Sequence, residues 1–315
     1  MTFFDENTIL KSLLNQKEDS LRNSNDELLI SLIMKNLASF PFISQCEIKE
    51  TYLPLANVVF SSIKKYQNSF LEKSQNKNQD SKNIPFVIGV AGSVSSGKST
   101  FSNILSIILK VLLDLKNIEI VSTDSFLYPT KILLQKDILN QKGFPISYDF
   151  KALIDFLKNL KNGEENLTTP IYSHKFYDID PDNQHHINHS DILIIEGLNI
   201  LQDNPEQNFN DANLKLRDFV DLSIYIDAKK EDLENWYFKR FNALMQEAKN
   251  NPNLFYHKYA HLSEKEAYKL GKNAWDNINL VNLIEYIEPT KDRAHLIIKK
   301  DSNHKIIDIK VQHQF

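Results

Sequence analysis

Residues 89–101 read GVAGSVSSGKSTF, and they hold three of the seven glycines in the chain of 315 residues. From Gly92 to Ser99 the stretch matches the phosphate-binding pattern Gly-x-x-x-x-Gly-Lys-Ser. The run IPFVIGVAG before it predicts a buried strand, and apolar residues at helical spacing from Phe101 to Leu115 predict a helix after it. Strand, glycine loop and helix in this order indicate a parallel sheet with the loop at its carboxyl edge.

The glycines have a direct physical role in such a loop. Phosphate oxygens must approach several backbone N–H groups, and a Cβ atom would block that approach or forbid the backbone angles. The helix N-terminus adds unpaired N–H groups, Lys98 can reach the β- and γ-phosphates, and the Ser99 hydroxyl can bind Mg²⁺. The alternative is a glycine turn with a solvated lysine. The predicted nucleotide-binding residues of the loop are Gly92, Ser93, Val94, Ser95, Ser96, Gly97, Lys98 and Ser99.

Beyond the loop, short apolar runs alternate with helical patterns. IEIVSTD, DILIIEG and VDLSIYIDA read as strands, and residues 150–162 and 230–249 read as helices. The strands are apolar throughout, which is typical of a parallel sheet covered by helices on both faces. The sequence therefore predicts an α/β fold, a P-loop NTPase-type parallel β-sheet flanked by helices.

The C-terminal part adds two further elements. A capping box formed by Ser263 and Glu266 predicts the start of a long helix over residues 263–286. The tail over residues 295–311 reads as a β-hairpin that turns at the residues DSNH.

Composition excludes several classes of protein. The net charge of −4 carries no basic excess, so we expect no nucleic-acid partner. Cys46 is the only cysteine, which rules out a disulfide within the chain and a cysteine-based zinc site. The first residues, MTFFDENTILKSLL, carry acidic side chains where a signal peptide needs basic ones, and no apolar run reaches the length of a membrane span. We expect a cytoplasmic protein without a membrane partner.

Three classes of P-loop protein compete at this point: GTPase switches, motor or assembly ATPases, and small-molecule kinases. The chain lacks the guanine-binding pattern Asn-Lys-x-Asp, because NKNQD at 76–80 has the wrong spacing and precedes the loop. Glu196 ends the run DILII and could bind Mg²⁺ through water, or it could be a solvated carboxylate at a strand end. Asp124 ends the strand before it, where a carboxylate can accept the proton of an attacking hydroxyl, as a kinase requires. Its alternative role is that of an N-cap or turn aspartate.

Two segments are candidates for the acceptor pocket. One is PIYSHKFYD at 170–178, which is dense in hydrogen-bonding rings, although His174 alone could be a structural histidine. The other is a helix on which Tyr237, Arg240 and Leu244 share a face. An arginine there could neutralise charge on the transferred phosphoryl group, whereas the aromatic side chains could simply be core. The histidines of QHHINH lie in a predicted polar loop, and we do not expect them to bind a metal.

With these residues in place, the chain resembles the bacterial type I pantothenate kinases, relatives of the uridine kinases and phosphoribulokinases. The likeness extends from about residue 50 to residue 311. The segments that carry it are YLPL at 52–55, GSVSSGKST at 92–100, STDSFLYP at 122–129, QKGFPISYD at 141–149, PIYSHKFYD, DILIIEGLNIL at 191–201, NWYFKRF at 235–241, NIN at 277–279 and PTKDRAHLIIKK at 289–300 with Asn303 and His304. KGFPxSYD and YSHxxYD are far more specific than the P-loop itself.

The resemblance implies an ATP- and Mg²⁺-dependent kinase that phosphorylates pantothenate to 4′-phosphopantothenate, the first committed step of coenzyme A synthesis. It implies Asp124 as catalytic base, Lys98 and Arg240 beside the transferred phosphate, Ser99 and Glu196 at the metal, and Thr100 among the phosphate contacts. Lys300 and His304 fall where the family encloses the adenine. Residues implied on the pantothenate path are Lys142, Tyr172, His174, Tyr177, Tyr237 and Asn279.

The resemblance also implies a homodimer that is inhibited by coenzyme A in competition with ATP. Two residues depart from the family pattern: Asn103 replaces an arginine beside the inhibitor's phosphates, and Leu244 replaces an aromatic residue near its thiol end. We therefore expect weaker feedback inhibition. A kinase of another small alcohol, such as a nucleoside or a sugar phosphate, and a nucleotide-binding regulator without turnover remain the alternatives.

The expected domain organisation follows from a change in the sequence pattern near residue 83. Residues 1–70 show amphipathic helical patterns, and residues 74–83 (SQNKNQDSKN) are polar, as in a loop or linker. We expect an N-terminal helical extension with its linker over residues 1–83, packed on the core, and a single kinase domain over residues 84–315.

Overall fold

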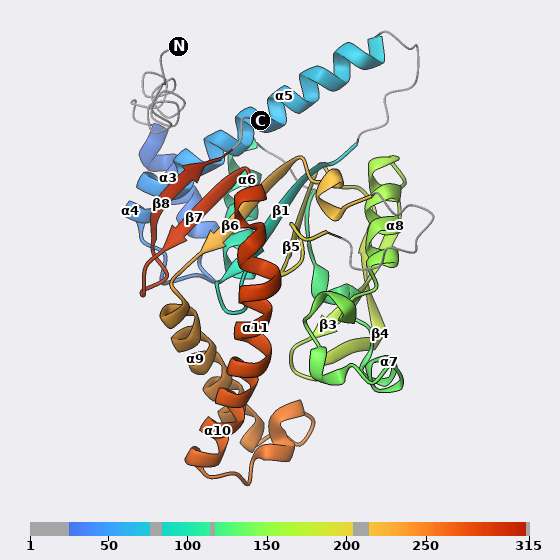
Figure 1. Cartoon of the computed structure of the whole chain (residues 1–315). Coiled ribbons are helices and arrows are strands. Elements are labelled where there is room, and N and C mark those ends of the chain that lie inside the picture. Colours follow the sequence, from blue (N-terminus) through green and yellow to red (C-terminus); the bar gives the residue numbers. More distant parts are fainter. Residues whose placement is uncertain (1–24, 76–83, 114–116, 204–213, 313–315) are drawn as a thin grey trace.

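The computed structural model describes residues 25–75, 84–113, 117–203 and 214–312. The predicted linker lies mostly outside these residues, as do the first 24 positions. The predicted α/β fold is confirmed: a six-stranded sheet has the order β2-β5-β1-β6-β7-β8, and its first five strands are parallel (Figure 1). Its strands are β2 (Ile118–Ser122), β5 (Ile192–Gly197), β1 (Phe86–Gly92), β6 (Leu222–Asp227), β7 (Leu296–Lys300) and β8 (Ile306–Val311).

Both faces of this sheet are buried, which explains why its strands are apolar throughout. In β1, Val87 contributes to one hydrophobic cluster while Ile88 contributes to the other, because successive side chains point to opposite faces. Helices α3 (Asn25–Asn36), α5 (Leu53–Gln75) and α6 (Lys98–Leu113) cover the face of Ile88. Helix α8 (Phe150–Lys161) and the start of α9 (Lys230–Lys249) cover the other face.

The helices of residues 230–279 extend beyond the carboxyl ends of the strands (Figure 1). We call this segment the C-terminal arm. The predicted capping box exists: the Ser263 side chain accepts from the Glu266 N–H, and α10 (Glu264–Ala274) begins there. The predicted long helix over residues 263–286 is present as one continuous helical run, but its hydrogen-bonding pattern changes along its length. The helical run continues as π-helix η7 (Trp275–Asn279), α11 (Leu280–Asn282), π-helix η8 (Leu283–Ile287) and 3₁₀-helix η9 (Glu288–Arg293).

Hairpins account for the remaining strands. The predicted C-terminal hairpin is present, since β7 and β8 pair antiparallel around the turn in which the His304 N–H bonds the Asp301 carbonyl at 3.0 Å. A second hairpin pairs β3 (Leu167–Ser173) with β4 (Asp178–Ile187). His185 and His186 of QHHINH therefore lie on a strand and not in a loop. The His185 ring pairs with the Glu119 carboxylate at 3.0 Å, and the described residues contain no cluster suited to a metal ion.

Short elements complete the described chain. They are α4 (Gln45–Glu47), η1 (Ile48–Tyr52), η2 (Thr123–Phe126), α7 (Thr130–Gln135), η3 (Leu139–Gln141), η4 (Pro145–Ser147), η5 (Leu216–Phe219) and η6 (Phe255–Tyr259). Among the described residues, no helix combines the length and the apolar character needed to cross a membrane. The two elements that matter most for the site are η2, which directly follows β2, and η4, which precedes α8.

Candidate phosphoryl-transfer site

The P-loop connects β1 to α6 with a backbone that requires its glycines. Gly92 has φ +147° and Gly97 has φ +84°, and a Cβ atom on Gly92 would lie 2.7 Å from the Ile226 carbonyl oxygen. The hydroxyl groups of Ser93, Ser95 and Ser96 are buried and have no hydrogen-bond partner among the described residues. Buried polar groups normally find partners, so these hydroxyls fit a loop built to receive the phosphates of a nucleotide.

Two lysines on different elements donate hydrogen bonds to backbone carbonyls of the loop. The Lys98 ammonium donates to the Ser93 carbonyl at 2.9 Å, and the Lys300 ammonium, from β7, donates to the Ser96 carbonyl at 3.1 Å. Burial lowers the pKa of both groups, and it brings the pKa of Lys300 to about 8, with the charge of Lys98 acting in the same direction. An anion in the loop would offset this cost, because it would favour the charged form of each lysine.

Ser99 and Glu196 lie together at the start of α6. The Ser99 hydroxyl donates to Glu196 Oε1 at 2.8 Å, and the Glu196 side chain is only 6% exposed. Burial raises the pKa of Glu196, as does the charge of Asp124, while Lys98 opposes the shift. A hydroxyl and a carboxylate are hard oxygen donors of the kind that Mg²⁺ binds, so this pair fits the predicted metal position.

Asp124 lies in the 3₁₀ turn η2, at the carboxyl end of β2. Its N–H donates to the Ser122 hydroxyl at 3.3 Å, and its carboxylate accepts a hydrogen bond from the Tyr148 hydroxyl at 3.0 Å. The sequence alternative of a turn aspartate is partly right for its backbone, whereas its carboxylate belongs to the site. The Asp124 carboxylate is near enough for its charge to act on the pKa of six other predicted or neighbouring groups, which are Lys98, Lys142, Tyr172, His174, Tyr177 and Glu196.

The β3–β4 hairpin supplies the wall that faces Asp124. The Lys142 ammonium donates to the Tyr177 carbonyl and lies 4.6 Å from the centre of the Tyr177 ring and 5.2 Å from that of Tyr172. Burial lowers the pKa of Lys142, while the nearby carboxylates of Asp178 and Asp124 act to raise it. Lys142, Tyr172 and Tyr177 are therefore brought together from two segments, as the prediction requires.

The C-terminal arm closes the other side. The Tyr177 ring stacks on Phe255 with ring centres 4.7 Å apart, and the Phe255 N–H bonds the Lys175 carbonyl at 3.0 Å. His174 lies edge-on to Tyr172 at 5.1 Å. Burial and the charge of Arg240 lower the pKa of His174, so Arg240 on α9 lies near His174 on the hairpin.

Tyr237 and Asn279 lie on two helices of this arm, and their contacts given by the structure are within the arm. The Tyr237 ring packs on Phe241 and on Trp275, with ring centres 6.0 Å and 5.4 Å apart. Asn279 ends the π-helix η7, and its side-chain amide donates to the Ala274 carbonyl at 3.2 Å. The alternative that the aromatic side chains of this helix are core residues is therefore partly right for Tyr237.

His304 lies in the β7–β8 turn, with φ +65°. Its ring stacks on Trp236 with the ring centres 3.8 Å apart, and the Trp236 indole N–H donates to the Ser302 carbonyl at 3.1 Å. Burial lowers the pKa of His304, and the charges of Lys300 and Lys239 act in the same direction. The turn thus holds a flat ring near Lys300, which suits the predicted contact with a base.

Sequence reasoning missed three aromatic residues at the site: Tyr148, Phe255 and Tyr256. Tyr148 belongs to the segment QKGFPISYD, and its place directly before α8 gave no signal that its side chain would reach Asp124. Phe255 and Tyr256 follow α9 in a stretch rich in aromatic side chains, FYHKY, which was the available signal.

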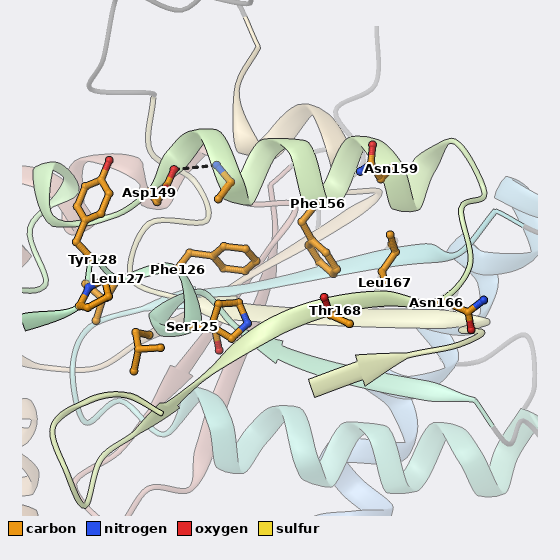
Figure 2. Close-up of a pocket in the computed structure, with 14 residues that line it drawn as sticks. Ser125, Phe126, Leu127, Tyr128, Asp149, Phe156, Asn159, Asn166, Leu167 and Thr168 are labelled. Carbon is orange, nitrogen blue, oxygen red and sulfur yellow. Dashed lines mark hydrogen bonds between the residues drawn. The ribbon is translucent and has the colours of Figure 1, made fainter. Parts of the chain in front are cut away.

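A cavity of about 480 Å³ lies behind the η2 turn, between α8 and the β3–β4 hairpin. Figure 2 shows the Phe126 and Phe156 rings side by side at this cavity, with centres 5.7 Å apart, and Asp149 capping α8 through a bond to the Ala152 N–H at 2.9 Å. None of the predicted site residues lines this cavity. It is therefore distinct from the space between the hairpin and the C-terminal arm.

Comparison with known proteins gives three findings. Residues 87–242 match the model of the Phosphoribulokinase / Uridine kinase family. The chain is similar to a pantothenate kinase of Streptococcus mutans, with 41% identity over 94% of this chain and 90% of that protein. It is also similar to a pantothenate kinase of Streptococcus suis, with 43% identity over 82% of this chain and 83% of that protein.

Solved structures of other kinases share the fold. D-glycerate 3-kinase from Cryptococcus neoformans aligns over 83% of this chain and 99% of its own length, with a TM-score of 0.55 and 14% identity. At that identity the likeness supports the arrangement of sheet and helices and says nothing of the substrate.

Proposed function

The chain belongs to the family of pantothenate kinases, and from that premise we propose how its site transfers a phosphoryl group from ATP to pantothenate. Its function is that of a phosphotransferase with an alcohol group as acceptor. The product is 4′-phosphopantothenate, and the reaction is the first committed step of coenzyme A synthesis. The site roles below are our assignments.

The P-loop residues 92–100 hold the phosphates of ATP, with Lys98 between the β- and γ-phosphates and Lys300 and His304 beside the rest of the nucleotide. Ser99 and Glu196 hold Mg²⁺, which when bound neutralises charge on the phosphates. The support for this arrangement is the set of buried, partnerless serine hydroxyls and the bond between Ser99 and Glu196.

Asp124 accepts the proton of the primary hydroxyl of pantothenate as that oxygen bonds the γ-phosphorus and the bond to the departing ADP breaks. Arg240 neutralises charge that spreads over the transferred group. The observation that carries the assignment is the position of Asp124: it follows β2 two residues after Ser122, which pairs with Glu196, and Glu196 bonds the Ser99 hydroxyl beside the P-loop.

Pantothenate binds between the hairpin and the C-terminal arm. This acid carries a carboxylate, an amide and hydroxyl groups, and the wall offers a cation in Lys142 together with ring hydroxyls and an imidazole. The residues assigned to it are Lys142, Tyr172, His174, Tyr177, Tyr237 and Asn279, alongside Asp124.

The test is ADP release with purified protein and MgATP, comparing pantothenate with uridine and ribulose 5-phosphate. We expect turnover with pantothenate alone. The D124N variant should lose transfer by at least about a hundredfold while it still binds ATP, because a general base contributes roughly 10²–10⁴-fold. Turnover with another alcohol would show that pantothenate is not the substrate. No turnover with any of the three compounds, with ATP binding intact, would favour a nucleotide-binding regulator.

Feedback by coenzyme A should be weak in this enzyme. The amide of Asn103 is neutral and donates to the Ser99 carbonyl at 2.7 Å, so it adds no charge toward an inhibitor's phosphates, and Leu244 offers no aromatic face. We expect the N103R variant to bind coenzyme A more tightly than the natural enzyme. An inhibition constant already as tight as that of arginine-bearing relatives would contradict this proposal.

We also propose that the enzyme is a homodimer and that residues 1–83 form an extension of a single kinase domain over residues 84–315. Tyr52 and Phe101 have ring centres 6.0 Å apart, and Tyr66 and Phe86 have ring centres 5.4 Å apart, so the extension packs on the first helix and first strand of the core. Light scattering in solution would establish the number of chains.

A further inference from the structure

The Asp124 carboxylate has one oxygen already engaged. The Tyr148 hydroxyl donates to Oδ1 at 3.0 Å, and Tyr148 is 2% exposed, so water does not replace it easily. An aspartate carboxylate rotates readily about its last side-chain bond, because that torsion is broad and roughly two-fold. A donor fixed on Oδ1 therefore selects one orientation of the carboxylate and leaves Oδ2 outside that bond.

The backbone fixes this donor relative to its acceptor. Tyr148 and Leu127 form an isolated antiparallel bridge. On either side of it, the Tyr128 N–H bonds the Ser147 carbonyl at 2.9 Å and the Asp149 N–H bonds the Phe126 carbonyl at 2.7 Å. The turn that carries Asp124 is thus joined by backbone bonds to the segment that carries Tyr148, and the two cannot shift independently.

We propose that Tyr148 is a positioning residue for phosphoryl transfer: its hydroxyl holds the Asp124 carboxylate so that Oδ2 faces the acceptor hydroxyl. The inference rests on the assignment of Asp124 as the base, made above. Tyr148 touches neither nucleotide nor acceptor in this role and acts only through Asp124.

A neutral donor suits this task better than a cation would. An arginine or lysine bonded to the carboxylate would favour its charged form strongly and weaken it as a base, typically by one to three pKa units. A phenol gives direction at a smaller electrostatic cost. Burial and the neighbouring Asp124 charge raise the pKa of Tyr148 well above its ordinary value, so the hydroxyl keeps its proton and remains a donor.

The experiment compares Y148F with the natural enzyme and with Y225F. Tyr225 is also 2% exposed, and it lies on β6 outside the residues assigned to the site, so Y225F measures the cost of losing a buried tyrosine hydroxyl. We expect Y148F to lower kcat by about ten- to hundredfold, part of what a general base contributes, with KM for ATP and pantothenate within about twofold. Y225F should leave kcat unchanged. Each kcat is expressed per mole of protein that binds ADP, so partial misfolding does not enter the comparison.

A double-mutant cycle with D124N separates positioning from a structural role. In the D124N background there is no base to orient, so adding Y148F should change the residual rate by less than about twofold. An equal loss in both backgrounds, or a Y148F enzyme with natural kcat, would overturn the proposal while leaving Asp124 as base. Full activity of D124N itself would instead overturn the assignment of the base, and the proposal with it.

Discussion

Among single residues, Lys300 has a charge that changes near physiological pH. It is 5% exposed, and burial lowers its pKa from 10.5 to about 8. Between these two values the unfolded chain binds more protons than the folded one, so the contribution of Lys300 to stability rises with pH in that window. Its effect on ATP has the opposite sign, because the phosphates favour the charged lysine that is lost as pH rises.

We predict that KM for ATP rises as the pH passes from 7 to 9 in the natural enzyme. The K300Q variant should show a higher KM at pH 7 and a flatter profile, because its side chain carries no charge at any pH. Lys299, the exposed neighbour on β7, provides the control, and K299Q should keep the natural profile. A steep profile that survives in K300Q would assign the pH dependence to another group. Steady-state kinetics across this range provides the measurement.

At the scale of elements, the alternation of strands and helices could be predicted from the sequence. The strands of the parallel sheet are apolar because they are buried on both faces, and the helices that cover them have one apolar face. The predicted helix at 230–249 coincides with α9, and the predicted strands coincide with β1, β2, β5 and β6 within a few residues. The β3–β4 hairpin was not recognised as such, since its strands are polar and partly exposed and carry a bulge. The π-helices were also missed, because no residue pattern marks the change in hydrogen bonding.

The junction of β5 with η2 gives a prediction about elements. A methyl group on Gly197 would lie 1.8 Å from the Thr123 hydroxyl oxygen, so G197A must push η2, and Asp124 with it, away from the sheet. We expect a loss of about 1–3 kcal/mol in the free energy of unfolding, typical of overpacking, and a marked fall in kcat. Denaturant titration and ADP-release kinetics provide the measurements.

The matched variant for this prediction is T123A with G197A. The Thr123 hydroxyl is buried and has no hydrogen-bond partner among the described residues, so its removal breaks no bond. T123A removes the contact at 1.8 Å but keeps the Thr123 Cβ, 2.8 Å from the new methyl group, so it relieves the clash in part. The double variant should regain part of the stability and of the activity. Full activity in G197A alone would show that β5 and η2 can separate without moving the base.

For the whole molecule, the N-terminal extension and the kinase domain should unfold together. Leu55 on α5 is 1% exposed and belongs to the same hydrophobic cluster as Ile88 of β1. We predict that L55A lowers the free energy of unfolding by about 2–5 kcal/mol and lowers the midpoint of one single transition. L28A, at a side chain 71% exposed on α3, should change it little. Two separate thermal transitions would instead divide the chain into independent domains.

The site residues that could not be predicted from the sequence pattern are those placed by contacts between distant segments. The P-loop pattern predicts the roles of Lys98 and Ser99 because loop and helix are contiguous. The bond between Lys300 and Ser96 spans 204 positions, and the bond between Tyr148 and Asp124 spans 24. No spacing rule indicates such contacts, so Lys300 came only from the family resemblance and Tyr148 only from the structure.

The stack of Trp236 on His304 gives the molecule an intrinsic optical reporter. The chain has only two tryptophans, and the other, Trp275, is 1% exposed within the arm. An imidazole ring in van der Waals contact with an indole alters its emission, and any ligand that shifts the β7–β8 turn would change that contact. Fluorescence excited in the tryptophan band should therefore report nucleotide arrival in the unlabelled protein, fast enough to follow in a stopped-flow instrument.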